Sequence, residues 1–281
     1  MSQPTPSQPP LLATLRPAPG QCAKMCRAPG TYQPPKEEGI GRTGAYKASI
    51  SPLSTVPDAI LLDVPVHIVQ QRLSPARLAP YLATANRDLD QGLALYLWNT
   101  QMSAALFEGL QHAEVVLRNA LSDQLAILRQ NAGHPDGKWF WHDTDPWFNP
   151  WWQPEMLRLL KDACRKLEKR QRPLTTGGIV AELSFGFWRY LLTSHYVSSL
   201  WTPALRHAFP KGLDRDDARK LVEEINLLRN RIAHHEPIYR RDLETDAMRI
   251  EQLLDWLCPT TAQWALANNR VADLWAQKPD A

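Results

Sequence analysis

A long run of apolar residues at helical spacing lies in the middle of the chain. Within residues 93–129, apolar side chains recur every three or four positions, the repeat of one helix face. Gly133 and Pro135 then predict the end of this helix. No segment shows the period-two alternation of a half-buried strand, so the sequence predicts an all-α fold, a helical bundle. The apolar stripe consists of Leu106, Leu110, Ala113, Leu117, Leu121 and Leu128.

Other helices are expected on both sides of this segment. Ser74 suits an N-cap with Pro75 at the first helical position. We expect Gly177-Gly178 to break the chain between two helices, and Pro237 to stop another. The expected helices after the long one cover residues 153–171, 179–200, 214–234, 242–257 and 260–276.

The N-terminal part of the chain has a different composition. Eleven of the 24 prolines lie in the first 60 residues, which contain few large apolar side chains. Such a segment cannot bury enough surface to offset its chain entropy. We therefore predict a disordered, proline-rich tail over residues 1–70 and one helical domain over 71–281. Cys22 and Cys26 lie in the tail without a second ligand pair nearby, so no zinc site is expected there.

Composition and charge limit the cellular compartments and the kinds of partner that we expect for the protein. No window approaches 18 consecutive apolar residues, which excludes a transmembrane helix. The first residues lack the basic start and apolar run of a secretory signal. Four cysteines are too few for a disulfide framework, so we expect a cytoplasmic protein without membrane contact. The net charge of +3 permits an anionic partner without demanding one.

The helix expected over residues 214–234 carries the residues best suited to chemistry. On a helical wheel, one apolar stripe faces the core, and Asn226, Asn230 and His234 stack along the opposite face at intervals of four. Arg229 lies at the edge between the two faces. An imidazole can transfer protons near neutral pH, a guanidinium can hold a phosphate, and an amide can orient either group. This combination suits phosphodiester chemistry, whereas an isolated histidine at a helix end would be an ordinary solvated residue.

Three segments resemble the Abi-like branch of the HEPN superfamily, a branch associated with abortive phage infection. The segment 228–237, Leu-Arg-Asn-Arg-Ile-Ala-His-His-Glu-Pro, contains an Arg-x4-His pattern from Arg229 to His234. The segment 179–188, Ile-Val-Ala-Glu-Leu-Ser-Phe-Gly-Phe-Trp, is similar to a second family segment, and 114–119, Glu-Val-Val-Leu-Arg-Asn, to a third. The resemblance covers about residues 72–260.

The resemblance implies a HEPN-like all-α homodimer in which two Arg-x4-His helices meet at a shared cleft. Active members of the superfamily are metal-independent endoribonucleases, so no metal or cofactor is expected. His234 would act as general acid or base, Arg229 would stabilise charge on the phosphate, and Asn230 would position them. A 2′,3′-cyclic phosphate product would follow, in phage defence or as a toxin. RNA would be the substrate, and an antitoxin or a phage-derived trigger would be a further partner.

Several assignments stay open at this stage. A non-catalytic RNA- or nucleotide-binding module is the alternative function. Glu114 and Arg118 form either an intrahelical ion pair or a support for the catalytic cleft. His235 falls towards the core side of the wheel, so we assign the chemistry to His234 unless a distortion before Pro237 reverses the two.

Two further segments offer binding surfaces. Residues 158–172 carry a net charge of +5, which suits either a solvated helix face or an RNA-backbone footprint. The aromatic segment 139–152 favours packing over base stacking, because basic residues are not interleaved with it. The residues that would bind RNA are Arg158, Lys161, Arg165, Lys166 and Lys169.

Overall fold

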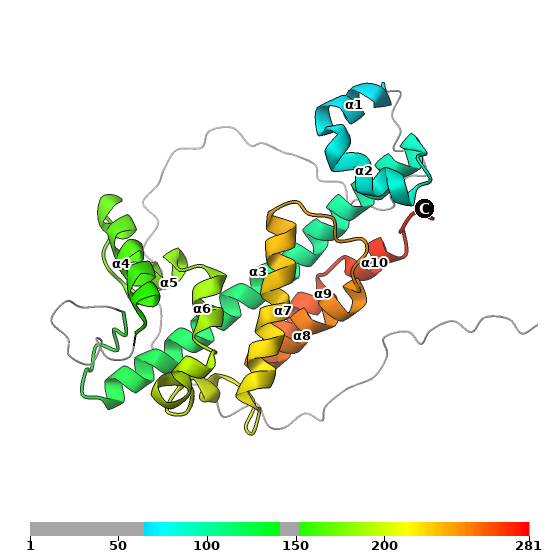
Figure 1. Cartoon of the computed structure of the whole chain (residues 1–281). Helices are drawn as coiled ribbons and strands as arrows, with labels where there is room; N and C mark the ends of the chain where they lie inside the picture. Colours follow the sequence, from blue (N-terminus) through cyan, green and yellow to red (C-terminus); the bar gives the residue numbers. More distant parts are fainter. Residues whose placement is uncertain (1–64, 141–151, 281) are drawn as a thin grey trace, which may run out of the picture. The chain divides into compact units, whose positions relative to one another are not determined.

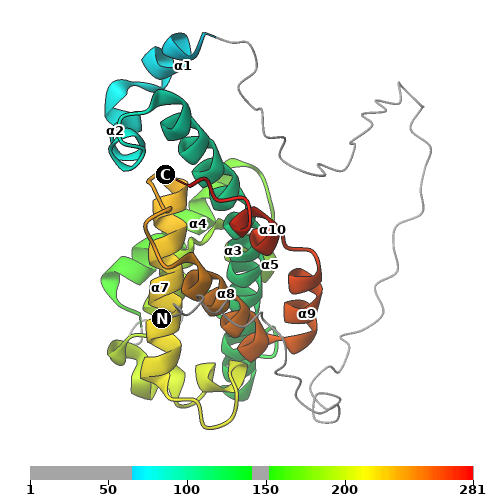
Figure 2. The same cartoon turned by 90° about the vertical axis from the view of Figure 1, so that its right-hand side faces the viewer.

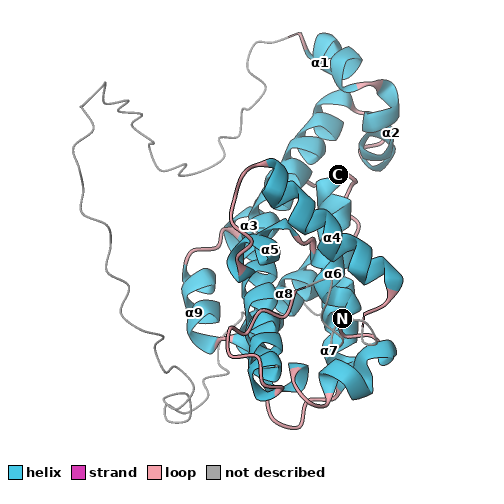
Figure 3. Cartoon of the chain, turned by 90° about the vertical axis from the view of Figure 1, so that its left-hand side faces the viewer, coloured by secondary structure: helices cyan, strands magenta, loops and turns pink. Residues whose placement is uncertain are grey.

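The computed structural model describes residues 65–140 and 152–280, and within these ranges it contains helices and loops but no strand (Figures 1 and 3). The all-α prediction is therefore confirmed for this part of the chain. The α-helices are α1 (Val66–Leu73), α2 (Pro75–Thr84), α3 (Leu89–Asn131), α4 (Pro154–Lys169), α5 (Thr176–Glu182), α6 (Phe185–Tyr190), α7 (Arg215–Ala233), α8 (Leu243–Leu257), α9 (Pro259–Ala267) and α10 (Val271–Trp275). Short 3₁₀ and π segments, η1 (Ser194–Tyr196), η2 (Val197–Trp201) and η3 (Leu205–Ala208), connect α6 to α7.

Helix α3 is the central element of this part of the chain. It spans 43 residues and contacts α2, α5, α6, α7, α8 and α10 along its length. Asp88 caps its start by accepting a hydrogen bond from the backbone N–H of Gln91 at 3.0 Å. Beyond its end, Gly133 adopts a φ of +92°, which glycine tolerates because it lacks a Cβ. Figure 1 shows α2 at one end of α3, α7 and α8 crossing its middle, and α4 and α5 near its other end.

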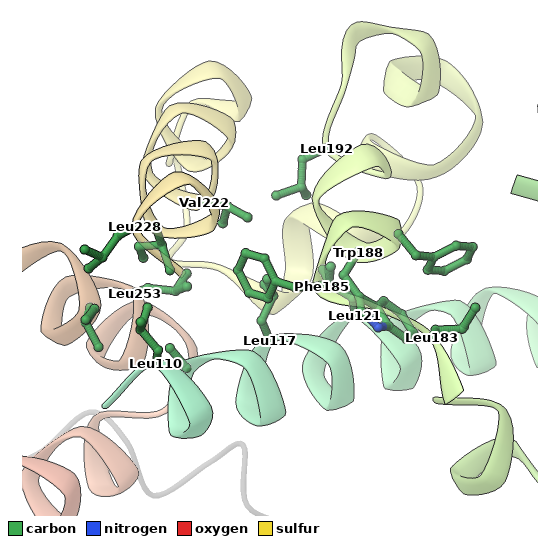
Figure 4. Packing of buried hydrophobic residues seen from close by; sticks show 14 of the residues in the cluster. Leu110, Leu117, Leu121, Leu183, Phe185, Trp188, Leu192, Val222, Leu228 and Leu253 are labelled. Atoms are coloured by element: carbon green, nitrogen blue, oxygen red, sulfur yellow. The ribbon is translucent and has the colours of Figure 1, made fainter. Parts of the chain in front are cut away.

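The hydrophobic core lies where α6, α7 and α8 cover one face of α3 (Figure 4). Leu110, Leu117 and Leu121 of α3 are at most 2% exposed, as the helical spacing predicts. Leu228 of α7 and Leu253 of α8 pack into the same cluster. Burial of each such leucine contributes about 1.5–3 kcal/mol, so this packing fixes how α7 lies on α3.

The aromatic segment packs where the structure describes it. Trp139 is fully buried, and its indole N–H donates to the Ser122 hydroxyl at 2.9 Å. Its ring lies 5.6 Å from that of Trp188, and Trp152 stacks on Phe187 at 5.9 Å. The preference for packing is thus confirmed for these residues, whereas residues 141–151 lie outside the described ranges. The segment 179–188 accordingly supplies three core aromatics from α6, Phe185, Phe187 and Trp188.

Several expected boundaries are close to the observed ones. The Ser74 hydroxyl accepts from the backbone N–H of Arg77 at 3.3 Å, and Pro75 opens α2 as predicted. Helices α4, α7 and α8 match their expected ranges within two residues. The tail boundary is different, because α1 already begins at Val66, whereas residues 1–70 were assigned to a disordered tail. Residues 1–64 lie outside the described ranges.

Two expected helices are wrong. Residues 179–200 do not form one helix, because Leu183 and Ser184 are extended between α5 and α6. The glycine pair lies inside α5, where the Thr175 hydroxyl accepts from the Gly178 N–H, and a Cβ at Gly178 would come within 3.1 Å of the Leu167 side chain on α4. Residues 260–276 split into α9 and α10, because the Asn268 amide donates to the Trp264 carbonyl and competes with helix continuation.

Figure 2 shows α8 between α7 and α9. None of the described helices combines the length and the apolar character needed to cross a membrane.

Candidate functional site

The C-terminal end of α7 is a defined cap. Its last turn closes with two hydrogen bonds, from the His235 N–H to the Ile232 carbonyl at 3.0 Å and from the Glu236 N–H to the Arg231 carbonyl at 2.8 Å. This is the Schellman arrangement, which requires a left-handed residue after the helix. That residue is His235, with a φ of +57°. A position that glycine usually occupies is therefore held by a histidine.

His235 does not lie where the helical wheel placed it. The wheel directs it towards the core, but the helix ends at Ala233, and His235 is exposed. Its carbonyl accepts a hydrogen bond from the Arg77 guanidinium of α2. This prediction was wrong because wheel angles no longer apply after a helix has ended. His235 therefore has a backbone role at the cap.

The polar face of α7 changes from buried to exposed towards its C-terminus. Asn226 is 8% exposed, Asn230 is half-buried, and His234 is exposed as the C-cap residue. The His234 N–H donates to the Asn230 carbonyl at 2.9 Å, so these residues remain one helical turn apart. The imidazole of His234 is therefore accessible, while the start of the face is inside the protein. Ile225, Leu228 and Ile232 on the opposite side are buried as predicted.

Arg229 joins α7 to α3. Its Nε lies 3.7 Å from Oε2 of Glu114, and its Nη1 donates to Oδ1 of Asn230 at 3.4 Å. The Arg229 side chain is about one third exposed, and its buried Nε faces the carboxylate of Glu114 as an ion pair without a hydrogen bond. The structure thus brings Glu114, Arg229 and Asn230 together, next to the helix end that carries His234.

Arg118 lies one turn beyond Glu114 on α3 but does not pair with it. The carboxylate of Glu114 faces Arg229 on α7 instead, so the intrahelical pair expected as one alternative is absent. The Nε of Arg118 is buried and has no hydrogen-bond partner within the described ranges. Of the two α3 residues, the structure brings only Glu114 into contact with Arg229.

The loop after α7 is fixed by residues that the sequence reasoning missed. The side-chain oxygen of Asn99, which is 5% exposed on α3, accepts from the N–H groups of Ile238 and Tyr239 at 2.8 and 3.0 Å. The Tyr239 hydroxyl donates to the Pro80 carbonyl of α2 at 2.7 Å. The sequence signal for this role was a polar asparagine within the otherwise apolar stretch of α3. These bonds fix the chain on the far side of the histidine pair.

Two further ion pairs outside the expected set support α7 and the loop that follows it. Asp246 of α8, almost fully buried, accepts two hydrogen bonds from Arg241 at 2.7 and 2.8 Å, and these bonds raise the pKa of Arg241. On the other side of α7, Arg189 of α6 pairs with Glu223. Arg189 and Glu223 are 34 positions apart, so no helical spacing rule could connect them, whereas Arg241 and Asp246 are only five apart. Helix α7 is therefore anchored to α6 before the candidate site, and the loop after the site is anchored to α8.

The basic residues expected to bind RNA lie on α4, which packs against α5. Arg158 forms ion pairs with Glu155 and Asp162, and Arg165 pairs with Asp162 at 3.0 Å. Arg165, Lys166 and Lys169 are exposed. The acidic residues of α4 thus neutralise the positive charge of Arg158 and Arg165 more than that of Lys166 and Lys169.

The described residues do not gather three histidine, cysteine or acidic side chains in a position to hold a metal ion. Cys164 is buried on α4, and this burial raises the pKa of its thiol. Cys258 is partly buried at the junction of α8 and α9. Cys22 and Cys26 lie outside the described ranges. Neither described cysteine belongs to the candidate site.

A family model described as Abi-like protein matches residues 77–240, more than half of the chain. The chain therefore belongs to the Abi-like family. The match begins on α2 and ends in the loop that follows α7, so it includes Glu114 and the whole of α7. None of the curated proteins and none of the solved structures compared with the chain matches it.

Proposed function

We propose that this protein is a metal-independent endoribonuclease of the HEPN type that acts in phage defence by abortive infection, or as a toxin. The observation that carries the proposal is the end of α7, where an accessible His234 follows Arg229, which Glu114 and Asn230 hold in place. Membership of the Abi-like family supports it, since this family is associated with abortive infection. The Arg-x4-His pattern of active HEPN nucleases runs from Arg229 to His234.

The chemistry is transfer of a phosphodiester to the neighbouring ribose 2′-oxygen. His234, as general base, takes the proton of the 2′-hydroxyl, whose oxygen then forms a bond to phosphorus. The bond from phosphorus to the 5′-oxygen breaks, and that oxygen takes a proton from an imidazolium. The products are a 2′,3′-cyclic phosphate and a 5′-hydroxyl end. After the step the base is an imidazolium and the acid is a neutral imidazole, and proton exchange with water returns both to their starting states.

Arg229 and Asn230 have distinct tasks in this step. The accessible side of the Arg229 guanidinium stabilises the charge that develops on the phosphate oxygens, and the amide of Asn230 holds the guanidinium in position. Glu114 orients Arg229 from the opposite side. Electrostatic stabilisation and proton transfer each contribute on the order of 10²–10⁴ in rate.

We further propose that two copies of the chain place their α7 ends in one cleft. In that arrangement one His234 serves as base and the partner's His234 as acid. An antitoxin or a phage-derived trigger would control access to such a cleft. His235 is also exposed at this end but belongs to the helix cap through its left-handed backbone, so the proposal takes the second imidazole from the partner's His234.

The test incubates purified protein with total RNA in EDTA and analyses the ends of the products. Three proteins are compared: the natural sequence, Arg229→Ala/His234→Ala, and a control, Arg206→Ala/His207→Ala. The control removes the same residue types from an exposed position on η3. We expect cyclic phosphate ends from the natural sequence and the control, and a loss of at least about 10³ in rate for the α7 variant.

RNA binding without cleavage by any of the three proteins would contradict the nuclease and favour the non-catalytic RNA-binding module. Cleavage that the α7 variant retains would place the chemistry elsewhere in the molecule. Cleavage that EDTA abolishes would contradict the metal-independent mechanism.

A further inference from the structure

A hollow of about 370 Å³ lies between α4 and the turn that joins α5 to α6. Arg165, Lys166 and Lys169 line it from α4, and Ser184 lines it from the turn. A second hollow, of about 290 Å³, adjoins it and is lined by Arg158, Lys161 and Arg165. Arg165 lines both, so the two hollows are neighbours along α4, and we call them together the α4 groove. It contains all five of the basic residues that the sequence singled out.

The acidic residues of the α4 groove are already neutralised. Asp162 pairs with both Arg158 and Arg165, and Glu182 pairs with Arg170 at the end of α4. Lys166 and Lys169 form no ion pair within the described ranges, and both are exposed. They therefore supply the excess positive charge of the larger hollow.

Ser184 adds an available hydrogen-bond donor. It is exposed, and its hydroxyl makes no capping bond to α6. An ammonium pair beside a free hydroxyl is a donor set suited to phosphate oxygens. Asp162 and Glu182 both lie in ion pairs with arginine, so they do not oppose an incoming anion as free carboxylates would.

The length of the groove favours a chain of phosphates over a single anion. From Arg158 to Lys169 the helix rises about 16 Å. That distance corresponds to roughly five stacked nucleotides at about 3.4 Å each. Charges spaced along such a length fit a polyanion, and a backbone footprint needs no base-specific groups.

We propose that the α4 groove binds the sugar–phosphate backbone of single-stranded RNA, with Lys166 and Lys169 each contacting a phosphate. The choice of RNA as the polyanion rests on the proposed function, whereas the anion-binding role rests on the groove itself. The groove then holds substrate away from the reacting bond, and the end of α7 performs the cleavage. Substrate affinity and catalytic rate are thereby assigned to different helices.

The experiment measures RNA binding by the full chain directly, so that it does not depend on cleavage. Every protein carries His234→Ala, and a fluorescein-labelled 12-nucleotide RNA is titrated by fluorescence anisotropy at several salt concentrations. The test variant is Lys166→Gln/Lys169→Gln. The control is Lys211→Gln/Lys220→Gln, which removes the same charge from two other exposed lysines.

We expect the test variant to raise Kd at least about tenfold near 0.1 M salt, and to reduce the slope of log Kd against log salt by about 1.4. The control should change Kd less than about threefold, since it alters only the long-range field. Both variants should unfold at the same temperature as their parent, because the lysines are exposed and unpaired.

Equal RNA affinities for the test variant and the control would overturn the proposal. A titration with labelled poly-glutamate detects the other class of anionic partner. If the test variant lost poly-glutamate binding but kept its RNA affinity, the groove would serve an acidic protein, and the proposal would be wrong. Normal RNA binding together with absent cleavage in the natural sequence would contradict the nuclease function while leaving the groove assignment intact.

Discussion

The end of α7 and the face of α4 carry similar cationic side chains in different settings. At the end of α7, Arg229 is half-buried against Glu114, and Asn99 and Arg77 hold the loop that follows. On α4, Arg158 forms its ion pairs with Glu155 and Asp162 of its own helix, and these pairs are open to solvent. One region is fixed by residues distant in sequence, and the other by neighbours one turn away.

This difference matches the two tasks that we assign. Proton transfer and phosphate stabilisation need groups held in a defined geometry, which buried tertiary hydrogen bonds provide. Binding of a sugar–phosphate backbone needs charge at the surface and tolerates mobile side chains. The predictions below test the contrast by removing first the reactive group, then its support, and last a surface ion pair.

The largest expected effect separates the two adjacent histidines. His234→Ala should lower the RNA cleavage rate by about 10³ or more, because it removes the proton-transfer group. His235→Gly should leave cleavage within about threefold and raise the free energy of unfolding by up to about 1 kcal/mol. The reason is that glycine adopts the left-handed φ of +57° without steric cost. Initial cleavage rates and urea denaturation measure both effects.

If the two results were reversed, with His235→Gly inactive and His234→Ala active, the assignment of the reactive histidine would be wrong. A loss of stability in His235→Gly would contradict the cap described for α7.

The next effect concerns the support of the α7 end. Asn99→Ala leaves the buried N–H groups of Ile238 and Tyr239 without their acceptor. We expect the free energy of unfolding to fall by about 2–6 kcal/mol, at about 1–3 kcal/mol for each of the two unsatisfied groups. Urea denaturation measures the change, with Asn119→Ala, an exposed position on the same helix, as the control. Equal stability of the two variants would mean that the loop is held in another way.

The smallest effect is expected on α4. The hydrogen bond from Arg158 lowers the pKa of Glu155, so the stabilisation from the pair is complete above the ordinary pKa of a glutamate and declines below it. Because the pair is exposed, Arg158→Gln should shift the thermal midpoint by no resolvable amount at pH 7. Any small difference should vanish as the pH falls through the pKa of Glu155. A clear destabilisation at pH 7 would contradict the view of α4 as a solvent-exposed binding face.

The sequence predicted the fold where periodicity and caps act locally. The apolar stripe of α3, the Ser74 cap and the extent of α7 follow from spacing and from the residues at helix ends. The break at Leu183-Ser184 did not follow, because the burial of Phe185 and Trp188 against α3 outweighs the helical tendency of that segment. The division of α9 from α10 depends on asparagine side chains that bond to the backbone.

The candidate site was predictable in its reactive residues but not in its supports. Arg229, Asn230 and His234 lie on one short segment, so their pattern is visible in the sequence. Asn99 and Arg189 act across distances in sequence that only the folded chain closes. His235 was misplaced because a helical wheel continues past the point where the Schellman cap ends the helix.

The central claim is that the end of α7 cleaves RNA and the α4 groove binds it, and one paired measurement tests it. Cleavage rate at saturating RNA and Kd for uncleaved RNA would be measured for the natural sequence, for Arg229→Ala/His234→Ala, and for Lys166→Gln/Lys169→Gln. The account predicts that the α7 variant loses cleavage with a Kd within about threefold of the natural sequence. The α4 variant should keep its cleavage rate at saturation while its Kd rises at least about tenfold. Loss of both properties together in either variant, or of neither in both, would contradict the account.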